Sequence, residues 1–224
     1  MKIKVKARRQ SGFSLVELLM VVLLLTIVVG ALFTQIDRAQ VRYRVEDQRL
    51  DMTQQEREFI DQFVRDLHQA GYPAASMYSA GVANPNSVAG GTYGLISLSD
   101  SDVQIEGDTD GNGSVESIEY SYDATCQCIR RSSLVKGTPG PATNFTEVQG
   151  VISTSQKIFA AYDTNGNSID LSSAVTDTAT LKTIKSVRIT LTTQGIGKDN
   201  DSRKDVQVSM TSIARLVNNQ GVTP

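Results

Sequence analysis

The sequence predicts an α+β protein in which a long N-terminal helix, transmembrane and then amphipathic, packs on a C-terminal antiparallel β-sheet head domain. Three observations lead to this prediction. An almost wholly apolar run extends from Glu17 to Phe33, no glycine or proline interrupts residues 37–70, and short segments of alternating polarity follow Pro73. The 224 residues have room for one such domain plus an extended element.

The apolar run has the length of a membrane span. About 20 apolar residues at about 1.5 Å rise per residue match the roughly 30 Å hydrocarbon thickness of a bilayer. Five basic residues and no acid precede the run, namely Lys2, Lys4, Lys6, Arg8 and Arg9. This flank is expected to stay cytoplasmic, so that the rest of the chain crosses the membrane.

Glu17 distinguishes this segment from a plain anchor or a cleaved secretory signal. A carboxylate inside a membrane span costs a few kcal/mol and usually marks function. A secretory signal would place small residues at its cleavage site, whereas Ala31-Leu32-Phe33 ends in a bulky side chain. We therefore favour a different kind of N-terminal signal.

The stretch Gly12-Phe13-Ser14-Leu15-Val16-Glu17 resembles the class III signal of type IV pilins and pseudopilins. The resemblance implies that residues 1–12 are a leader, which prepilin peptidase removes by cutting after Gly12. It also implies that Phe13 becomes N-methylated. Glu17 would then pair with the N-terminal amine of a neighbouring subunit, which would satisfy an otherwise costly buried acid.

Loss of the leader would make the protein acidic. The full chain carries a net charge of −2, and removing five basic leader residues changes this to about −7. An acidic chain without basic patches argues against nucleic acid as a partner and suits cations.

The predicted helix spans residues 13–72, apolar over 13–36 and amphipathic over 37–70. Apolar residues recur at helical spacing in the second part, at Val41, Val45, Met52, Phe59, Ile60, Phe63, Val64 and Leu67. Gly71 and Pro73 supply an end signal. A free coiled coil is the alternative, but a sustained heptad is missing.

The segment from Phe63 to Pro73 resembles the end of the long helix in PilW-type minor pilins, with His68 where that family usually has arginine. His68 is the only histidine of the chain. General acid–base or Ser-His chemistry lacks a second histidine, so the sequence favours a protein that is not an enzyme.

Residues 73–224 are predicted to form the β-rich head. After a polar loop over 74–91, eight segments have strand character: Tyr93–Ser99, Val103–Glu106, Ser117–Tyr122, Cys128–Leu134, Asn144–Gln149, Gln156–Tyr162, Ile184–Thr193 and Val206–Val217. The last two are the longest and are expected to pair antiparallel through an exposed loop over 195–204.

An acidic loop lies between two of these strands. It matches the calcium-loop pattern D-x-[DN]-x-[DN]-G-x5-E residue for residue. Because Ca²⁺ takes six to eight oxygen ligands, alternate side chains of a tight loop suit it. The predicted ligands are Asp108, Asp110, Asn112, Ser114 through its carbonyl, Glu116 directly or through water, and Glu119 as the closing residue. Flanking strands replace the usual helices, and an ordinary polar turn is the alternative.

A second loop, from Asp163 to Asp170, echoes this pattern only in part. It has Ser168 in place of the sixth-position glycine and Ala174 in place of the closing acid. Turn chemistry accounts for its Asn-Gly-Asn run.

Cys126 and Cys128 are the only cysteines. In an oxidising compartment they are expected to form a disulfide, either with each other or between molecules. A local Cys126–Cys128 bridge is the preferred prediction. Two thiols without further soft ligands do not suit zinc.

Together the resemblances imply a minor pilin that joins other minor pilins and the major pilin in a priming or tip complex. It would sit in the inner membrane with its head in the periplasm, and later in the pilus. The alternatives are a type II secretion minor pseudopilin, a calcium-dependent adhesive module and an anchored hydrolase that uses the acidic loop.

Overall fold

The computed structural model describes residues 12–72, 94–152, 157–198 and 205–218. Leader residues 1–11, the loop predicted over 74–91 and residues 199–204 of the last predicted loop lie outside these ranges. The chain divides into two compact units, Met1–Glu46 and Asp47–Pro224.

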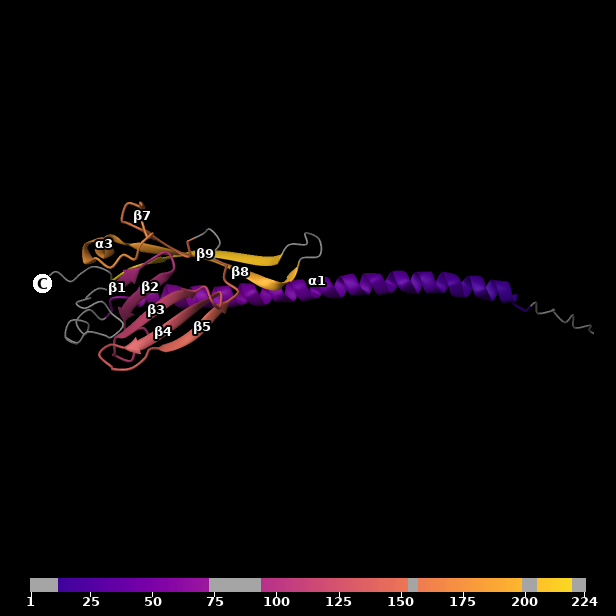
Figure 1. The fold of residues 1–224 in the computed structure, drawn as a ribbon, viewed down its shortest axis with the longest axis horizontal. Coiled ribbons are helices and arrows are strands. Elements are labelled where there is room, and N and C mark those ends of the chain that lie inside the picture. Colours follow the sequence, from indigo (N-terminus) through magenta and orange to yellow (C-terminus); the bar gives the residue numbers. More distant parts are fainter. Residues whose placement is uncertain (1–11, 73–93, 153–156, 199–204, 219–224) are drawn as a thin grey trace, which may run out of the picture. The chain divides into compact units, whose positions relative to one another are not determined.

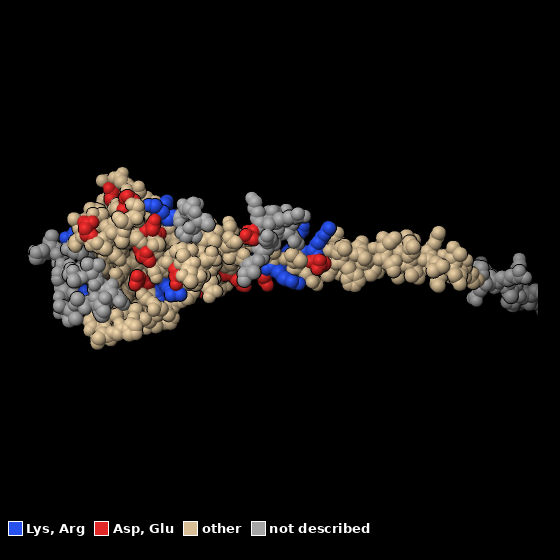
Figure 2. All heavy atoms as spheres, viewed as in Figure 1, with Lys and Arg blue, Asp and Glu red and all other residues tan. Residues whose placement is uncertain are grey.

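Helix α1 covers Leu15–Gln69 without interruption, as predicted. It is the one described helix whose length and composition would let it cross a membrane. On the face shown in Figure 2, uncharged side chains cover the N-terminal part of α1 and charged side chains follow farther along it. In the sequence, the charged residues that follow the apolar run begin at Asp37. Gly71 adopts a left-handed φ of 84°, and the amide of Tyr72 donates to the Gln69 carbonyl, which closes the last turn.

The first sheet of the head is an antiparallel meander in the order β1-β2-β3-β4-β5. Its strands are β1 Leu95–Leu98, β2 Asp102–Gly107, β3 Glu116–Asp123, β4 Cys128–Val135 and β5 Thr143–Gln149. The loop between β2 and β3 contains the acidic residues of the predicted metal site.

The second sheet has the order β7-β6-β8-β9. Its strands are β6 Phe159–Tyr162, β7 Ser168–Ile169, β8 Ser186–Lys198 and β9 Asp205–Arg215. Strands β8 and β9 pair antiparallel as predicted, but β8 runs on to Lys198 through a register shift, so residues 195–198 are strand and not loop.

Two short elements were not predicted from the sequence. Strand β7 has only two residues, and helix α3 covers Thr178–Thr183. The α3 helix has a local signal, because the Asp177 carboxylate accepts a hydrogen bond from the Thr180 amide (2.8 Å) as an N-cap.

The C-terminal part of α1 forms the centre of the head core (Figure 1). Phe59, Phe63 and Leu67 are buried, whereas Val41, Val45 and Met52 from the same predicted stripe are only partly covered. The Phe63 ring lies 5.1 Å from the ring of Tyr120 on β3 and 5.4 Å from the ring of Phe159 on β6, measured between centroids. One helix residue therefore contacts both sheets.

Candidate functional sites

The predicted processing site lies just before α1. Gly12 and Phe13 precede the helix, and the first helical hydrogen bond joins the Leu18 amide to the Ser14 carbonyl (3.1 Å). A Cβ on Gly12 would meet no atom within 4 Å, and Phe13 is 79% exposed. The bond after Gly12 is thus outside regular structure, as proteolysis requires.

Glu17 lies in the first turn of α1, where the helix dipole favours a negative charge. It comes four residues after Phe13, about one helical turn. A free amine created at Phe13 would therefore lie two residues before the helix whose first turn carries the carboxylate.

The structure brings together three acids of the predicted calcium loop. One carboxylate oxygen from each of Asp108, Asp110 and Glu116 lies within 4.8 Å of the others, and no other such cluster occurs in the described part of the chain. The Asp108 carboxylate accepts hydrogen bonds from the amides of Gly111 (2.8 Å) and Gly113 (3.0 Å). The loop backbone thereby curls around Asp108.

Glu116 is the buried member of this group. It begins β3 and is only 5% exposed, and its Oε2 accepts from the Thr109 amide (3.0 Å). Its Oε1 is buried without a hydrogen-bond partner. Burial is the main cause that raises the pKa of this carboxyl group, and the charges of Asp110 and Asp108 raise it further.

Asn112 and Ser114 are neighbours of the cluster. The Asn112 side chain donates to Asp110 Oδ2 (2.7 Å) and accepts from the Ser114 amide (2.7 Å). The amide group of Asn112 thus orients Asp110 and the turn around it.

Glu119 is not part of the cluster. It lies within β3, where its Cα pairs with Gln104 on β2 and Ser132 on β4. Strand residues an odd number apart point to opposite faces, so Glu119 and Glu116 diverge. The closing residue of a calcium loop normally lies on a helix, whose turn directs its side chain toward the ion. In this protein the residue lies on a strand, which directs its side chain elsewhere.

The other predicted sites have simple geometry. Asp163 accepts from the amides of Asn165 and Asn167 (both 2.8 Å), which is a polar turn around one acid. Cys126 and Cys128 form a disulfide at the turn between β3 and β4, with their Cα atoms 5.2 Å apart.

A buried polar network between α1 and the first sheet was not predicted. The Asp66 carboxylate accepts from the Tyr120 hydroxyl (2.5 Å) and from Arg131 Nε (3.0 Å), and Arg131 Nη2 lies 2.9 Å from it. Asp66 is fully buried. Burial of the Tyr120 phenol raises its pKa, and the nearby negative charge of Asp66 raises it further. An acid on the apolar stripe, three residues after Phe63, was the available sequence signal.

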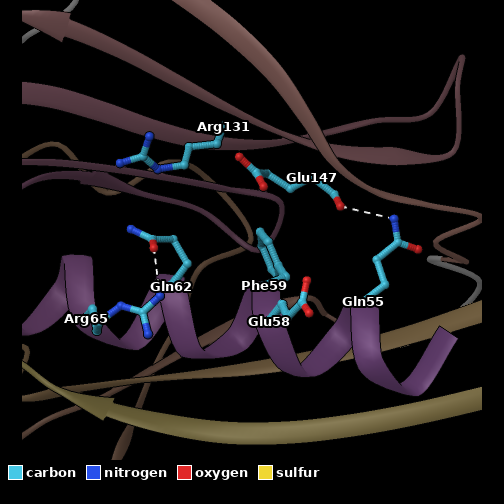
Figure 3. A pocket seen from close by; sticks show the side chains of 7 residues that line it. All are labelled: Gln55, Glu58, Phe59, Gln62, Arg65, Arg131 and Glu147. Atoms are coloured by element: carbon cyan, nitrogen blue, oxygen red, sulfur yellow. Dashed lines mark hydrogen bonds between the residues drawn. The ribbon is translucent and has the colours of Figure 1, made fainter. Parts of the chain in front are cut away.

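A polar pocket of about 460 Å³ lies beside this network (Figure 3). It is lined by Gln55, Glu58, Phe59, Gln62 and Arg65 from α1, Arg131 from β4 and Glu147 from β5. Several lining groups already bind one another or the network. Gln62 donates to Asp66 (2.6 Å), Arg65 donates to Gln62 (2.8 Å), and Gln55 donates to the Glu147 carbonyl (3.2 Å). The bond from Gln55 joins α1 to the edge strand β5, whereas the other two lie within α1.

Glu56 is a second buried acid of α1. It is fully buried and accepts from the Thr193 hydroxyl on β8 (2.7 Å), while its Oε2 has no hydrogen-bond partner. Burial raises its pKa, against an opposing effect of the Thr193 hydrogen bonds. The folded protein therefore holds the proton more tightly than the unfolded chain does.

From this pKa shift we predict that Glu56→Gln raises stability near neutral pH by about 1 kcal/mol. In the wild type, Glu56 contributes most to the free energy of unfolding at pH values below the ordinary glutamate pKa. This contribution is lost as the pH rises through the higher pKa of the folded protein. Urea unfolding of the full chain in detergent across this pH range measures the difference. Glu58→Gln, an exposed change on the same helix, is the control. A Glu56→Gln effect that is independent of pH would contradict the prediction.

Comparison with known proteins supports the N-terminal assignment. Residues 7–33 match the family model described as the prokaryotic N-terminal methylation motif. The predicted class III signal is thereby confirmed as a segment, and the chain carries a prokaryotic N-terminal methylation motif.

Among solved structures, the chain is similar to a type IV-like pilin from Thermus thermophilus. The two are 12% identical, the match covers 75% of this chain and 97% of that chain, and the TM-score is 0.47. Comparison with curated proteins finds no match.

Proposed function

We propose that the protein is a minor pilin of a type IV pilus, a structural subunit of the priming or tip complex that starts polymerisation. The observation that carries this proposal is the methylation motif placed directly at the start of α1. The uninterrupted helix and the β head that follows it have the architecture that a filament subunit needs: an apolar helix for lateral packing and a polar head for the surface.

The proposed life cycle begins in the inner membrane, with the N-terminus cytoplasmic and the head periplasmic. Prepilin peptidase removes the leader, and Glu17 pairs with the Phe13 amine of a neighbouring subunit in the filament. The partners are then other minor pilins and the major pilin. The PilW-like end of α1 supports a minor pilin over a major one.

Processing is the first expected result. On co-expression with prepilin peptidase, the full chain should lose residues 1–12 and gain one methyl group on Phe13, and Gly12→Val should block both changes. Intact mass and N-terminal sequencing measure this. Gly30→Ala is the matched control, because it also adds a side chain into open space but leaves the cleavage site unchanged. An unshortened wild type, or cleavage beyond Phe33, would refute the proposal.

A type II secretion minor pseudopilin is the nearest rival. Deletion of the gene separates the two functions, because the minor-pilin proposal requires loss of surface pili with secretion intact. Complementation with wild type should restore pili, and Glu17→Ala should not. A secretion defect with normal pili would favour the rival.

A calcium-dependent adhesive module is the second candidate function, favoured by the convergence of Asp108, Asp110 and Glu116. It requires that the protein bind a surface ligand and that a chelator abolish the binding.

A further inference from the structure

We propose that the loop between β2 and β3 binds one calcium ion through the carboxylates of Asp108, Asp110 and Glu116. This inference is independent of the pilin function, since it depends only on the head. It also reduces the ligand set that the sequence pattern predicts, because it keeps Glu116 and leaves out Glu119.

The buried Oε1 of Glu116 is the strongest observation for a ligand. An unsatisfied polar group in a protein interior costs about 1–3 kcal/mol, and more if it is charged. Glu116 is 5% exposed and Asp108 is 6% exposed, and both belong to the group of oxygens within 4.8 Å of one another. A cation coordinated through Oε1 of Glu116 would satisfy this orphaned oxygen, and it would neutralise three converging carboxylates.

The donor chemistry selects the kind of cation. The three side chains offer only oxygen atoms, which suits a hard cation and not zinc or copper. Calcium accepts six to eight ligands in flexible geometry, whereas magnesium demands a near-ideal octahedron. The loop has Gly111 and Gly113 in left-handed conformations (φ 74° and 87°), so it curls irregularly. Water and loop carbonyl groups such as that of Ser114 would complete the coordination.

The loop is attached to the end of α1. The Asp108 amide donates to the Tyr72 carbonyl (2.6 Å), and the Gly71 amide donates to the Glu106 carbonyl (2.8 Å). A Cβ on Gly107 would lie only 2.5 Å from the Gln69 carbonyl oxygen, so the backbone at the end of β2 is in close contact with the backbone at the end of α1. Calcium bound at Asp108 therefore stabilises the junction between the helix and the first sheet.

Calorimetric titration of the full chain in detergent with calcium chloride tests the site. We expect saturable binding of one ion, a rise in the melting temperature that EDTA reverses, and much weaker binding of magnesium chloride. Glu116→Gln should abolish the binding heat. Glu119→Gln, the matched control from the same strand, should retain it.

Three results would overturn the proposal. Binding that survives Glu116→Gln and is lost in Glu119→Gln would restore the ligand set of the sequence pattern. No binding by the wild type would reduce the loop to a polar turn. Stronger binding of magnesium than of calcium would contradict the choice of ion.

A folding defect in Glu116→Gln would not obscure the answer. Asp110 is exposed, so Asp110→Ala removes a ligand with little risk to the fold, and it should lower the calcium affinity and the melting shift. Asp163→Asn alters the other acidic turn and should leave both unchanged. Failure of these predictions leaves the processing result at Gly12 untouched, so the two proposals are tested separately.

Discussion

Replacing Asp66 by alanine is expected to destabilise the head by about 3–5 kcal/mol, because it leaves the Arg131 guanidinium and the Tyr120 hydroxyl without their buried acceptor. Breaking a buried ion pair at one partner is more costly than replacing the whole pair, since an uncompensated charge remains. The loss is a large share of the 5–15 kcal/mol that a typical domain possesses.

Urea unfolding of the full chain in detergent, followed by tyrosine fluorescence because the chain has no tryptophan, measures this change. Asp61→Ala is the matched control, since Asp61 lies on the same helix and is exposed. Asp66→Asn separates the charge from the hydrogen bond: it keeps one acceptor oxygen and should still destabilise the head. Equal stability of Asp66→Ala and Asp61→Ala would show that the network contributes nothing.

Replacing Phe63 by alanine is expected to cost about 3–5 kcal/mol through the cavity that it opens. Phe63 is fully buried and contacts Tyr120 of the first sheet and Phe159 of the second. The lost ring therefore removes packing from both sheets at once, and neither sheet alone is positioned to fill the space.

The same unfolding experiment tests this result, with Leu50→Ala as control because Leu50 is apolar, on the same helix and 60% exposed. If Phe63→Ala lowered the free energy of unfolding as little as Leu50→Ala does, the core would not be centred on α1. Hydrogen exchange of the β3 and β6 amides adds a local measure, and both strands should lose protection.

Removal of an ion from the proposed calcium site and loss of Asp66 would act on different parts of the junction between α1 and the first sheet. Asp108 bonds to Tyr72 just beyond the helix, whereas Asp66, which lies within the helix, binds Arg131. Because the two interactions share no partner, their effects on unfolding free energy should be nearly additive.

The sequence by itself determined the elements with a local or periodic signal. The apolar run and the uninterrupted segment that follows predict one helix, and the helix covers Leu15–Gln69. Period-2 alternation located all eight predicted strands, and Gly71 ends the helix in the expected left-handed conformation. The signal at Gly12–Glu17 is equally local, because it is a short linear motif.

Only the tertiary structure decided which of these elements meet. The strands form two sheets, linked by isolated bridges such as Val151 to Thr193, and alternation cannot specify partners. Asp66 binds residues 54 and 65 positions away, which no short-range pattern encodes. Glu116 belongs to the acidic cluster and Glu119 does not, because the chain after the loop is a strand. In a strand, side chains alternate between the two faces and each residue advances the chain by about 3.3 Å. The spacing of the motif is a property of the sequence, but the direction of each carboxylate depends on the element that carries it.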